Sequence, residues 1–187
     1  MNKDKIKHIF QQGGLIAYPT EAVYGLGCDP FNEAAVNKLL ACKKRSRDKG
    51  LILIASSWDQ IKSLIAPIDE SLLKKAKASW PGPFTWIFPA STEVPKWITG
   101  KFDSVALRIT AHPIAHALCE LLEQPIVSTS ANIEGQIPAR TDAEVRKLFG
   151  DQIDYLIEGP VGSLKKPTEI RDILTDKIIR LSGENNA

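Results

Sequence analysis

The sequence predicts an α/β fold with a twisted, open, mixed sheet, flanking helices and a concave basic cleft. Strand-like apolar runs alternate with helical patterns along the chain. The runs that begin at Leu15 and Pro125 stop in small hydroxyl residues, and a cationic segment, 43–49, leads directly into a third apolar run at 51–55. Such groups at the ends of buried strands are typical of an anion-binding cleft.

In the first half of the chain, helices and strands alternate. Ile6, Ile9 and Phe10 recur at helical spacing, and the segment 57–60 has the pattern of a capping box. The predicted elements are a helix around 6–10, a strand from Leu15, a helix over 32–43, a strand over 51–55, and helices opening at Ser57 and over 69–79.

The second half contains most of the predicted strands. Pro113 suits the first turn of a helix, and Thr141 with Glu144 forms another capping box. The close spacing of the last strands indicates a mixed sheet rather than a wholly parallel one. The predicted elements are strands over 84–88 and 104–109 joined by a loop, helices over 113–123 and from Thr141 to Gly150, and strands near 153–157, 169–174 and 177–181.

Composition predicts one ordinary globular domain over residues 1–187. Of the 187 residues, 43% are hydrophobic and 25% are charged, enough to bury a substantial core. The net charge is +2, but segment 38–49 holds six Lys or Arg against one Asp, a local charge of +5. The positive charge is therefore concentrated on one segment.

Cysteine usage and the absence of targeting signals predict a cytoplasmic protein without membrane contact. Cys28, Cys42 and Cys119 are odd in number and not closely paired, which favours buried, reduced thiols. The N-terminus has no apolar core of signal-peptide length, and no run approaches the roughly 20 residues of a membrane span.

Several common site motifs are absent: the phosphate-binding P-loop, the dinucleotide glycine fingerprint, the nucleophile elbow and the His-Glu-x-x-His zinc motif. His112 and His116 are four residues apart but have no third ligand, so we assign no metal to them. Ser128, Thr129 and Ser130 have no identifiable activating base, so a binding role is favoured over a nucleophilic one.

The basic segment 43–49 has two interpretations. It could be the solvated end of a helix, where cations favour the helix dipole, or a phosphate-binding loop. Because it joins a buried strand directly and two other strand ends carry ligand-like groups, we favour phosphate binding. Lys43 and Arg45 are expected on a surface loop.

Arg108 lies on a strand with alternating faces. The two-residue period places Ser104, Ala106 and Arg108 on one face and Val105 and Leu107 on the other. If the first face lines the cleft, Arg108 can bind a carboxylate through two hydrogen bonds. The alternative is an edge-strand arginine in solvent.

Five ordered motifs resemble the YrdC-like threonylcarbamoyl-AMP synthases, from about residue 8 to 181. They are Tyr18-Pro19-Thr20-Glu21 with Tyr24-Gly25-Leu26, Lys43-x-Arg45, Trp80-Pro81-Gly82-Pro83-Phe84-Thr85, Ser104-Val105-Ala106-Leu107-Arg108, and Ser130-Ala131-Asn132.

The resemblance implies that L-threonine, bicarbonate and ATP form threonylcarbamoyl-adenylate and pyrophosphate, for threonylcarbamoyladenosine modification of tRNA. Mg²⁺ is expected with ATP, and downstream tRNA threonylcarbamoyl-transferase proteins and tRNA itself are the implied partners. Lys43 and Arg45 would be catalytic. The implied ATP-binding residues are Lys43, Arg45, Lys49, Ser104, Ser130, Asn132 and Arg180. The implied threonine-binding residues are Thr20, Arg108, Ser128 and Thr168.

The sequence also departs from the family pattern. Ser46 replaces a proline, Ile54 stands where longer relatives have a histidine near threonine, and Glu134 replaces a small residue before Gly135. The chain ends at Ala187, which resembles the short single-domain form.

Two rival functions stay open. The first is a non-catalytic protein that binds tRNA or double-stranded RNA through the same basic concavity, although few aromatic residues accompany the cations. The second is a related carbamoyl-handling reaction that uses carbamoyl phosphate, as in hydrogenase-maturation proteins, whose zinc-finger and acylphosphatase-like segments do not occur in this sequence.

Overall fold

One mixed, open sheet organises the computed structural model, which describes residues 2–165 and 168–180. The sheet has nine strands in the order β7-β1-β2-β6-β3-β5-β4-β8-β9. The pairs β1/β7, β3/β5 and β4/β8 are parallel, and the other neighbours are antiparallel. The predicted mixed α/β sheet is confirmed. The strands are β1 (Ile16–Pro19), β2 (Tyr24–Gly27), β3 (Ile52–Ala55), β4 (Phe84–Pro89), β5 (Ser104–Ile109), β6 (Ile126–Ser130), β7 (Tyr155–Leu156), β8 (Glu169–Asp172) and β9 (Ile178–Arg180).

Most helices begin where the sequence predicts. The Asn32 side chain caps its helix by accepting from Ala35 N–H at 3.1 Å, and Thr141 and Glu144 form the predicted capping box. None of the helices in the described part of the chain is long and apolar enough to span a membrane. The helices are α1 (Lys3–Gln11), α2 (Glu33–Lys43), α3 (Glu70–Ala78), α4 (Lys96–Thr99), α5 (Pro113–Leu122) and α6 (Asp142–Phe149), with 3₁₀ turns η1 (Arg47–Lys49), η2 (Lys62–Leu64) and η3 (Gly150–Gln152).

Some local predictions are wrong. The helix expected at Ser57 does not form, because the Gln60 side chain accepts from Ser56 N–H and donates to Cys119 O, both at 3.0 Å, instead of capping a helix. The single strand expected from Leu15 is followed by a second one, β2, which folds back antiparallel on β1. Helix α4 forms inside the expected loop. The last predicted strand reaches Leu181, which lies outside the described residues.

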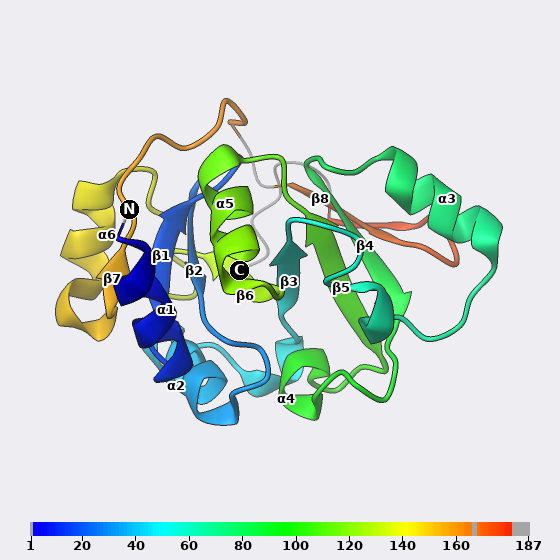
Figure 1. The fold of residues 1–187 in the computed structure, drawn as a ribbon, viewed down its shortest axis with the longest axis horizontal. Coiled ribbons are helices and arrows are strands. Elements are labelled where there is room, and N and C mark those ends of the chain that lie inside the picture. The colour runs from blue at the N-terminus through cyan, green and yellow to red at the C-terminus, as the bar shows by residue number, and fades with distance from the viewer. Residues whose placement is uncertain (1, 166–167, 181–187) are drawn as a thin grey trace.

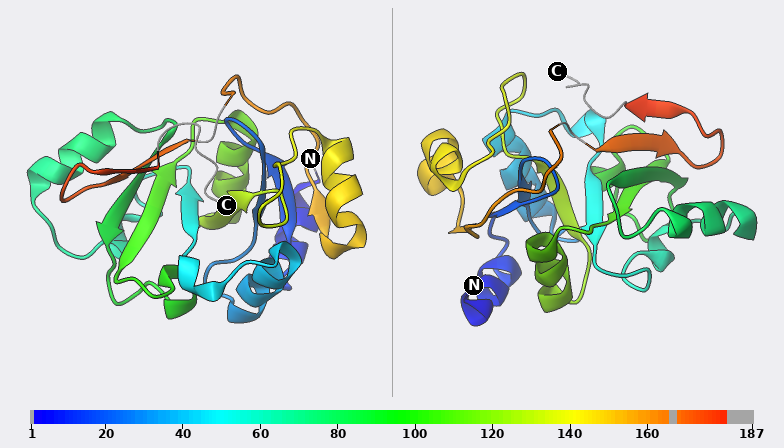
Figure 2. Two further views of the ribbon diagram at one scale, coloured as in Figure 1. Left: turned by 180° about the vertical axis from the view of Figure 1, so that it is seen from behind. Right: turned by 90° about the horizontal axis from the view of Figure 1, so that it is seen from above.

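Helices cover both faces of the sheet (Figure 1). On β1, Ile16 and Tyr18 face a core shared with α1 and α5, whereas Ala17, together with Leu15 just before the strand, faces the larger core beneath α2 and α6. Both views in Figure 2 place α3 and the β8–β9 hairpin at one end of the molecule and α6 at the other. Helix α5 packs on β1 and β3, which leaves part of its face of the sheet uncovered.

A cationic cleft as the candidate active site

The floor of the cleft is the part of the sheet face that α5 does not cover. Ser128, Ile52, Ala106, Ile87 and Asp172 are successive register partners across β6, β3, β5, β4 and β8, and all five line the cavity. The adjacent row begins with Ile126 and Ile54, which are buried against α5. The face of β5 that carries Ser104, Ala106 and Arg108 therefore lines the cleft.

The cavity has a volume of about 920 Å³, at the upper end of the range for small-molecule sites. Ten of the eleven side chains that the family resemblance implies for ligand binding line it, and Lys43 does not. The ten are Thr20, Arg45, Lys49, Ser104, Arg108, Ser128, Ser130, Asn132, Thr168 and Arg180.

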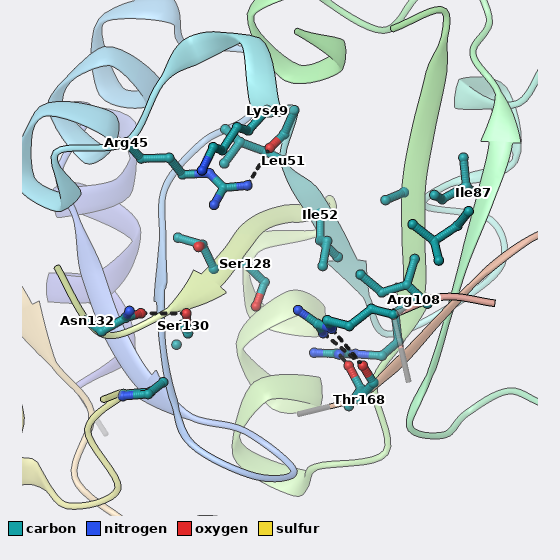
Figure 3. A pocket seen from close by; sticks show the side chains of 18 of the residues that line it. Arg45, Lys49, Leu51, Ile52, Ile87, Arg108, Ser128, Ser130, Asn132 and Thr168 are labelled. Atoms are coloured by element: carbon teal, nitrogen blue, oxygen red, sulfur yellow. Dashed lines mark hydrogen bonds between the residues drawn. The ribbon is translucent and has the colours of Figure 1, made fainter. Parts of the chain in front are cut away.

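The cationic segment after α2 is fixed by its backbone. Lys44 has a left-handed conformation (φ 53°), and the N–H of Arg45 donates to Leu40 O at 3.0 Å, which ends the helix as in a Schellman motif. Gly100 is needed nearby, because a Cβ there would lie 2.6 Å from Asp48 O. Figure 3 shows Arg45 and Lys49 together at one end of the cleft.

Arg45 and Lys49 are held differently. The Nη2 of Arg45 donates to Gly50 O at 3.2 Å, while its Nε is buried and has no hydrogen-bond partner among the described residues. Lys49 forms an ion pair with Glu134. The remaining cations of this segment are solvated: Lys44 is exposed, and Arg47 pairs with Glu33 at the surface. The interpretation as a solvated helix end thus applies to Lys44 and Arg47, whereas phosphate binding by Arg45 and Lys49 stays a prediction.

Lys43 lies beneath the wall of the cleft. It is the last residue of α2 and is only 2% exposed, so the prediction of a surface loop position is wrong for this residue. Its ammonium donates to the carbonyls of Ser130 and Asn132, the latter at 2.7 Å, and to Asn132 Oδ1 at 3.3 Å. Three acceptors satisfy the three donors of the ammonium and so stabilise its buried position. Burial, with the charge of Arg45 added, lowers the pKa of Lys43 to about 8.

Ser130 and Asn132 shape the turn after β6. The Ser130 hydroxyl donates to Asn132 Oδ1 at 2.6 Å, and Asn132 Nδ2 donates to Ile133 O and Gln136 O at 3.0 and 2.9 Å. Asn132 therefore satisfies the backbone of its own turn while it lines the cleft (Figure 3). A role toward a nucleotide stays a prediction.

Arg108 and Arg180 meet at Thr168. Arg108 is 5% exposed, and its Nη1 donates to Thr168 Oγ1 at 2.7 Å (Figure 3). The Nη2 of Arg180 donates to the Thr168 carbonyl at 2.8 Å. Arg108 is thus a buried residue of a central strand, not an edge-strand arginine in solvent.

Glu21 is the charged residue at this end of the cleft to which sequence reasoning gave no role. Its Oε2 lies 3.4 Å from Arg108 Nη2, and its Oε1 accepts from Thr110 Oγ1 at 2.6 Å and Ala111 N–H at 3.3 Å. Burial alone raises the pKa of Glu21, but Arg108 and these hydrogen bonds outweigh it and hold the pKa below its usual range. The sequence feature that could have identified Glu21 is the position of an acidic residue just after a buried strand.

The charges of the cleft favour an anion. Burial, with the charges of Arg108 and Arg45 added, lowers the pKa of Arg180 to about 10. Burial also lowers the pKa of Arg45, against the opposing effect of Glu134. Because these guanidinium groups stay protonated at neutral pH while they repel one another, a bound anion relieves the repulsion.

The histidines and cysteines lie away from the cleft lining. The buried His112 contacts Pro160 O through Nε2 at 3.1 Å, and His116 contacts Thr110 O through Nδ1 at 3.3 Å. Cys28 and Cys119 are buried free thiols, as predicted, and Cys42 is half-buried.

Comparison with known proteins shows the family to which this chain belongs. Residues 8–182 match the model of the Sua5/YciO/YrdC family, whose description reads "Telomere recombination". The chain belongs to the Sua5/YciO/YrdC family. The resemblance predicted from five motifs is confirmed over nearly the whole chain.

Two relatives are threonylcarbamoyl-AMP synthases. That of Coxiella burnetii (strain RSA 493 / Nine Mile phase I) is 56% identical over 171 residues, which cover 91% of this chain and 92% of the relative. That of Cellvibrio japonicus (strain Ueda107) is 50% identical over 175 residues, covering 94% and 93%. The crystal structure of P. abyssi Sua5 complexed with L-threonine aligns with a TM-score of 0.90 and 36% identity, over 98% of this chain and 55% of that one. This chain thus spans little more than half of the Sua5 structure.

Proposed function

We propose that this protein joins L-threonine, bicarbonate and ATP into threonylcarbamoyl-AMP with release of pyrophosphate, and is therefore a nucleotidyltransferase. One observation carries the proposal. A single cleft holds the cationic end at Arg45 and Lys49 together with the buried Arg108, in a chain 56% identical to a protein named threonylcarbamoyl-AMP synthase.

The ATP end of the proposed site comprises the cationic segment, the turn after β6, and one residue each of β5 and β9. Arg45 and Lys49 neutralise the phosphates and act as the catalytic cations. Lys43 takes part through the Ser130 and Asn132 carbonyls that it holds. The residues proposed to contact ATP directly are Arg45, Lys49, Ser104, Ser130, Asn132 and Arg180.

The threonine end is built on Arg108. Its guanidinium binds the amino-acid carboxylate, and Thr20, Ser128 and Thr168 surround the rest of the amino acid. All four side chains line the cleft. Support comes from the relative P. abyssi Sua5, whose structure was solved in complex with L-threonine.

The chemistry suits a cleft of cations and hydroxyls. The threonine amine and bicarbonate give a carbamate and water. A carbamate oxygen then attacks the α-phosphorus of ATP, and the bond from that phosphorus to the pyrophosphate oxygen breaks. Because the carbamate is already anionic, this step needs alignment and charge neutralisation rather than a general base.

Mg²⁺ accompanies ATP in this proposal. Between residues 2 and 165 and between 168 and 180, no three His, Cys, Asp or Glu side chains are grouped to hold a metal. The acids lining the cleft are Asp48 and Asp172, and Asp172 Oδ1 already accepts from Leu174 N–H at 2.9 Å. Mg²⁺ would therefore be carried by the ATP phosphates rather than by a cluster of protein carboxylates, and it would supply charge neutralisation there.

The proposal extends to organisation and partners. The described strands form one sheet, which supports a single domain over residues 1–187. The activated product needs an acceptor, so the next reaction is carried out by transferase proteins that modify tRNA. In this proposal tRNA itself contacts the basic cleft or its rim.

The test uses α-phosphorus-labelled ATP and carbon-labelled bicarbonate with threonine. We expect one product carrying both labels and an equal amount of pyrophosphate, each dependent on threonine. Formation of an adenylate from carbamoyl phosphate without threonine would favour the carbamoyl-handling rival. No pyrophosphate, together with RNA binding that weakens steeply with salt, would favour the RNA-binding rival.

A further inference from the structure

A carboxylate opposes the cations at the ATP end of the cleft. Glu134, in the loop after β6, forms an ion pair with Lys49 of η1. Its own backbone N–H donates to Lys43 O at 3.0 Å, so the end of α2 fixes where this side chain starts. The ion pair thereby joins two segments that border the same end of the cavity.

This carboxylate is the local counter-ion of the cationic segment. The hydrogen bond from Lys49 holds the pKa of Glu134 below its usual range, and the charges of Lys49, Arg45 and Lys43 act in the same direction. The Glu134 side chain is 26% exposed and that of Lys49 44%. The pair is therefore ionised, partly hydrated and able to open.

A phosphate chain bound at this end needs the same ammonium. Lys49 lines the cavity, and one ammonium offers three donors on a flexible stem. A phosphate oxygen and the Glu134 carboxylate would share those donors and repel each other. The repulsion between the two anions weakens phosphate binding at this end, and it disappears when the phosphate leaves.

We infer that Glu134 weakens the hold of the cleft on phosphate anions and so promotes the release of pyrophosphate. The inference rests on the proposed function, which makes pyrophosphate a product. The affinity for pyrophosphate should depend on Glu134 more than the affinity for ATP does. Pyrophosphate is held by charge alone, whereas ATP also binds through its nucleoside.

The test measures binding of inorganic pyrophosphate by calorimetry to the wild type and to Glu134→Gln. We expect about fivefold tighter binding to the variant, the size of one exposed ion pair, and a matching fall in the inhibition constant of pyrophosphate. Glu134→Ala should behave in the same way. Thermal melting verifies that both variants are folded, which the retained backbone bond to Lys43 favours.

Glu33→Gln is the matched control, because Glu33 pairs with Arg47 of the same cationic segment and neither residue lines the cleft. Its pyrophosphate affinity should stay at the wild-type value. In a Lys49→Met background, Glu134→Gln should have a smaller effect, since the contested ammonium is gone.

Three results would overturn the inference: unchanged or weaker pyrophosphate binding in both folded Glu134 variants, equal tightening in the Glu33 control, or a full effect in the Lys49→Met background. None of these depends on turnover. Failure of the wild type to make the doubly labelled product would instead overturn the proposed function.

Discussion

The two ends of the cleft place their cations in different ways. Arg45 and Lys49 come from a short segment after a helix and face the cavity partly exposed, with Glu134 as an outer counter-ion. Arg108 stands on a central strand, 5% exposed, between Glu21 and Thr168. Substitutions at the first end should therefore change binding with little effect on stability, whereas at the second end binding and folding are coupled.

The largest expected effect is at Arg108. Arg108→Ala should lower kcat/KM for threonine about a hundredfold, because a charge-assisted pair of hydrogen bonds is lost. Arg108→Lys keeps the charge but not the planar fork, so a loss of about tenfold is expected. Steady-state kinetics with each substrate varied would measure both. Equal losses for ATP and threonine, or none, would contradict the assignment to the carboxylate.

Glu21→Gln tests whether the buried Arg108 end of the cleft contributes to the stability of the fold. Removing this charge leaves Arg108 without its buried partner and should lower the free energy of unfolding by about 2 kcal/mol in urea titrations. Glu33→Gln, at an exposed pair, should change it by less than about 0.5 kcal/mol.

The pH dependence of this effect has a defined sign. The folded-state pKa of Glu21 is lowered, so the stabilisation is full above the unfolded pKa and is lost as pH falls through the folded one. The stability difference between wild type and Glu21→Gln should therefore shrink in acid. A difference that stays constant would show that charge is not its origin.

Arg45→Ala tests whether binding and stability are separable at the ATP end of the cleft. It should lower kcat/KM for ATP about tenfold with a nearly unchanged melting temperature, because Arg45 lines the cleft from a segment outside the sheet. Arg47→Ala is the matched variant, since Arg47 pairs with Glu33 at the surface, and it should keep wild-type kinetics. If the two variants were equally impaired, general positive charge would explain the effect better than a site at Arg45.

The smallest effect is expected from the protonation of Lys43. Burial lowers the pKa of its ammonium to about 8, and a bound polyanion favours the charged form. ATP affinity should thus be full at about pH 7 and below, and fall about threefold to fivefold by pH 9. Calorimetry across this range measures it. Lys43→Arg stays charged, so its affinity should lack the step, and a step that persists there would contradict the role of Lys43.

Local patterns carried most of the fold prediction. The alternation of Ser104, Ala106 and Arg108 against Val105 and Leu107 needs only the two-residue period of a strand, and β5 has those two faces. The capping box at Thr141 likewise needs only neighbours in sequence. The family resemblance implied eleven binding side chains, and ten of them line one cavity, although their roles toward ligands stay predictions.

The sheet class, most element positions and the family were therefore predictable from the residues alone. Three contacts of the site were not: the bonds from Lys43 to the turn after β6, the pairing of Glu21 with Arg108, and the pairing of Glu134 with Lys49. The partners in these contacts are 85 to 89 residues apart in the chain. Helix periods and caps are set within a few residues, whereas such pairings depend on strand register and on which part of a sheet face a helix leaves open.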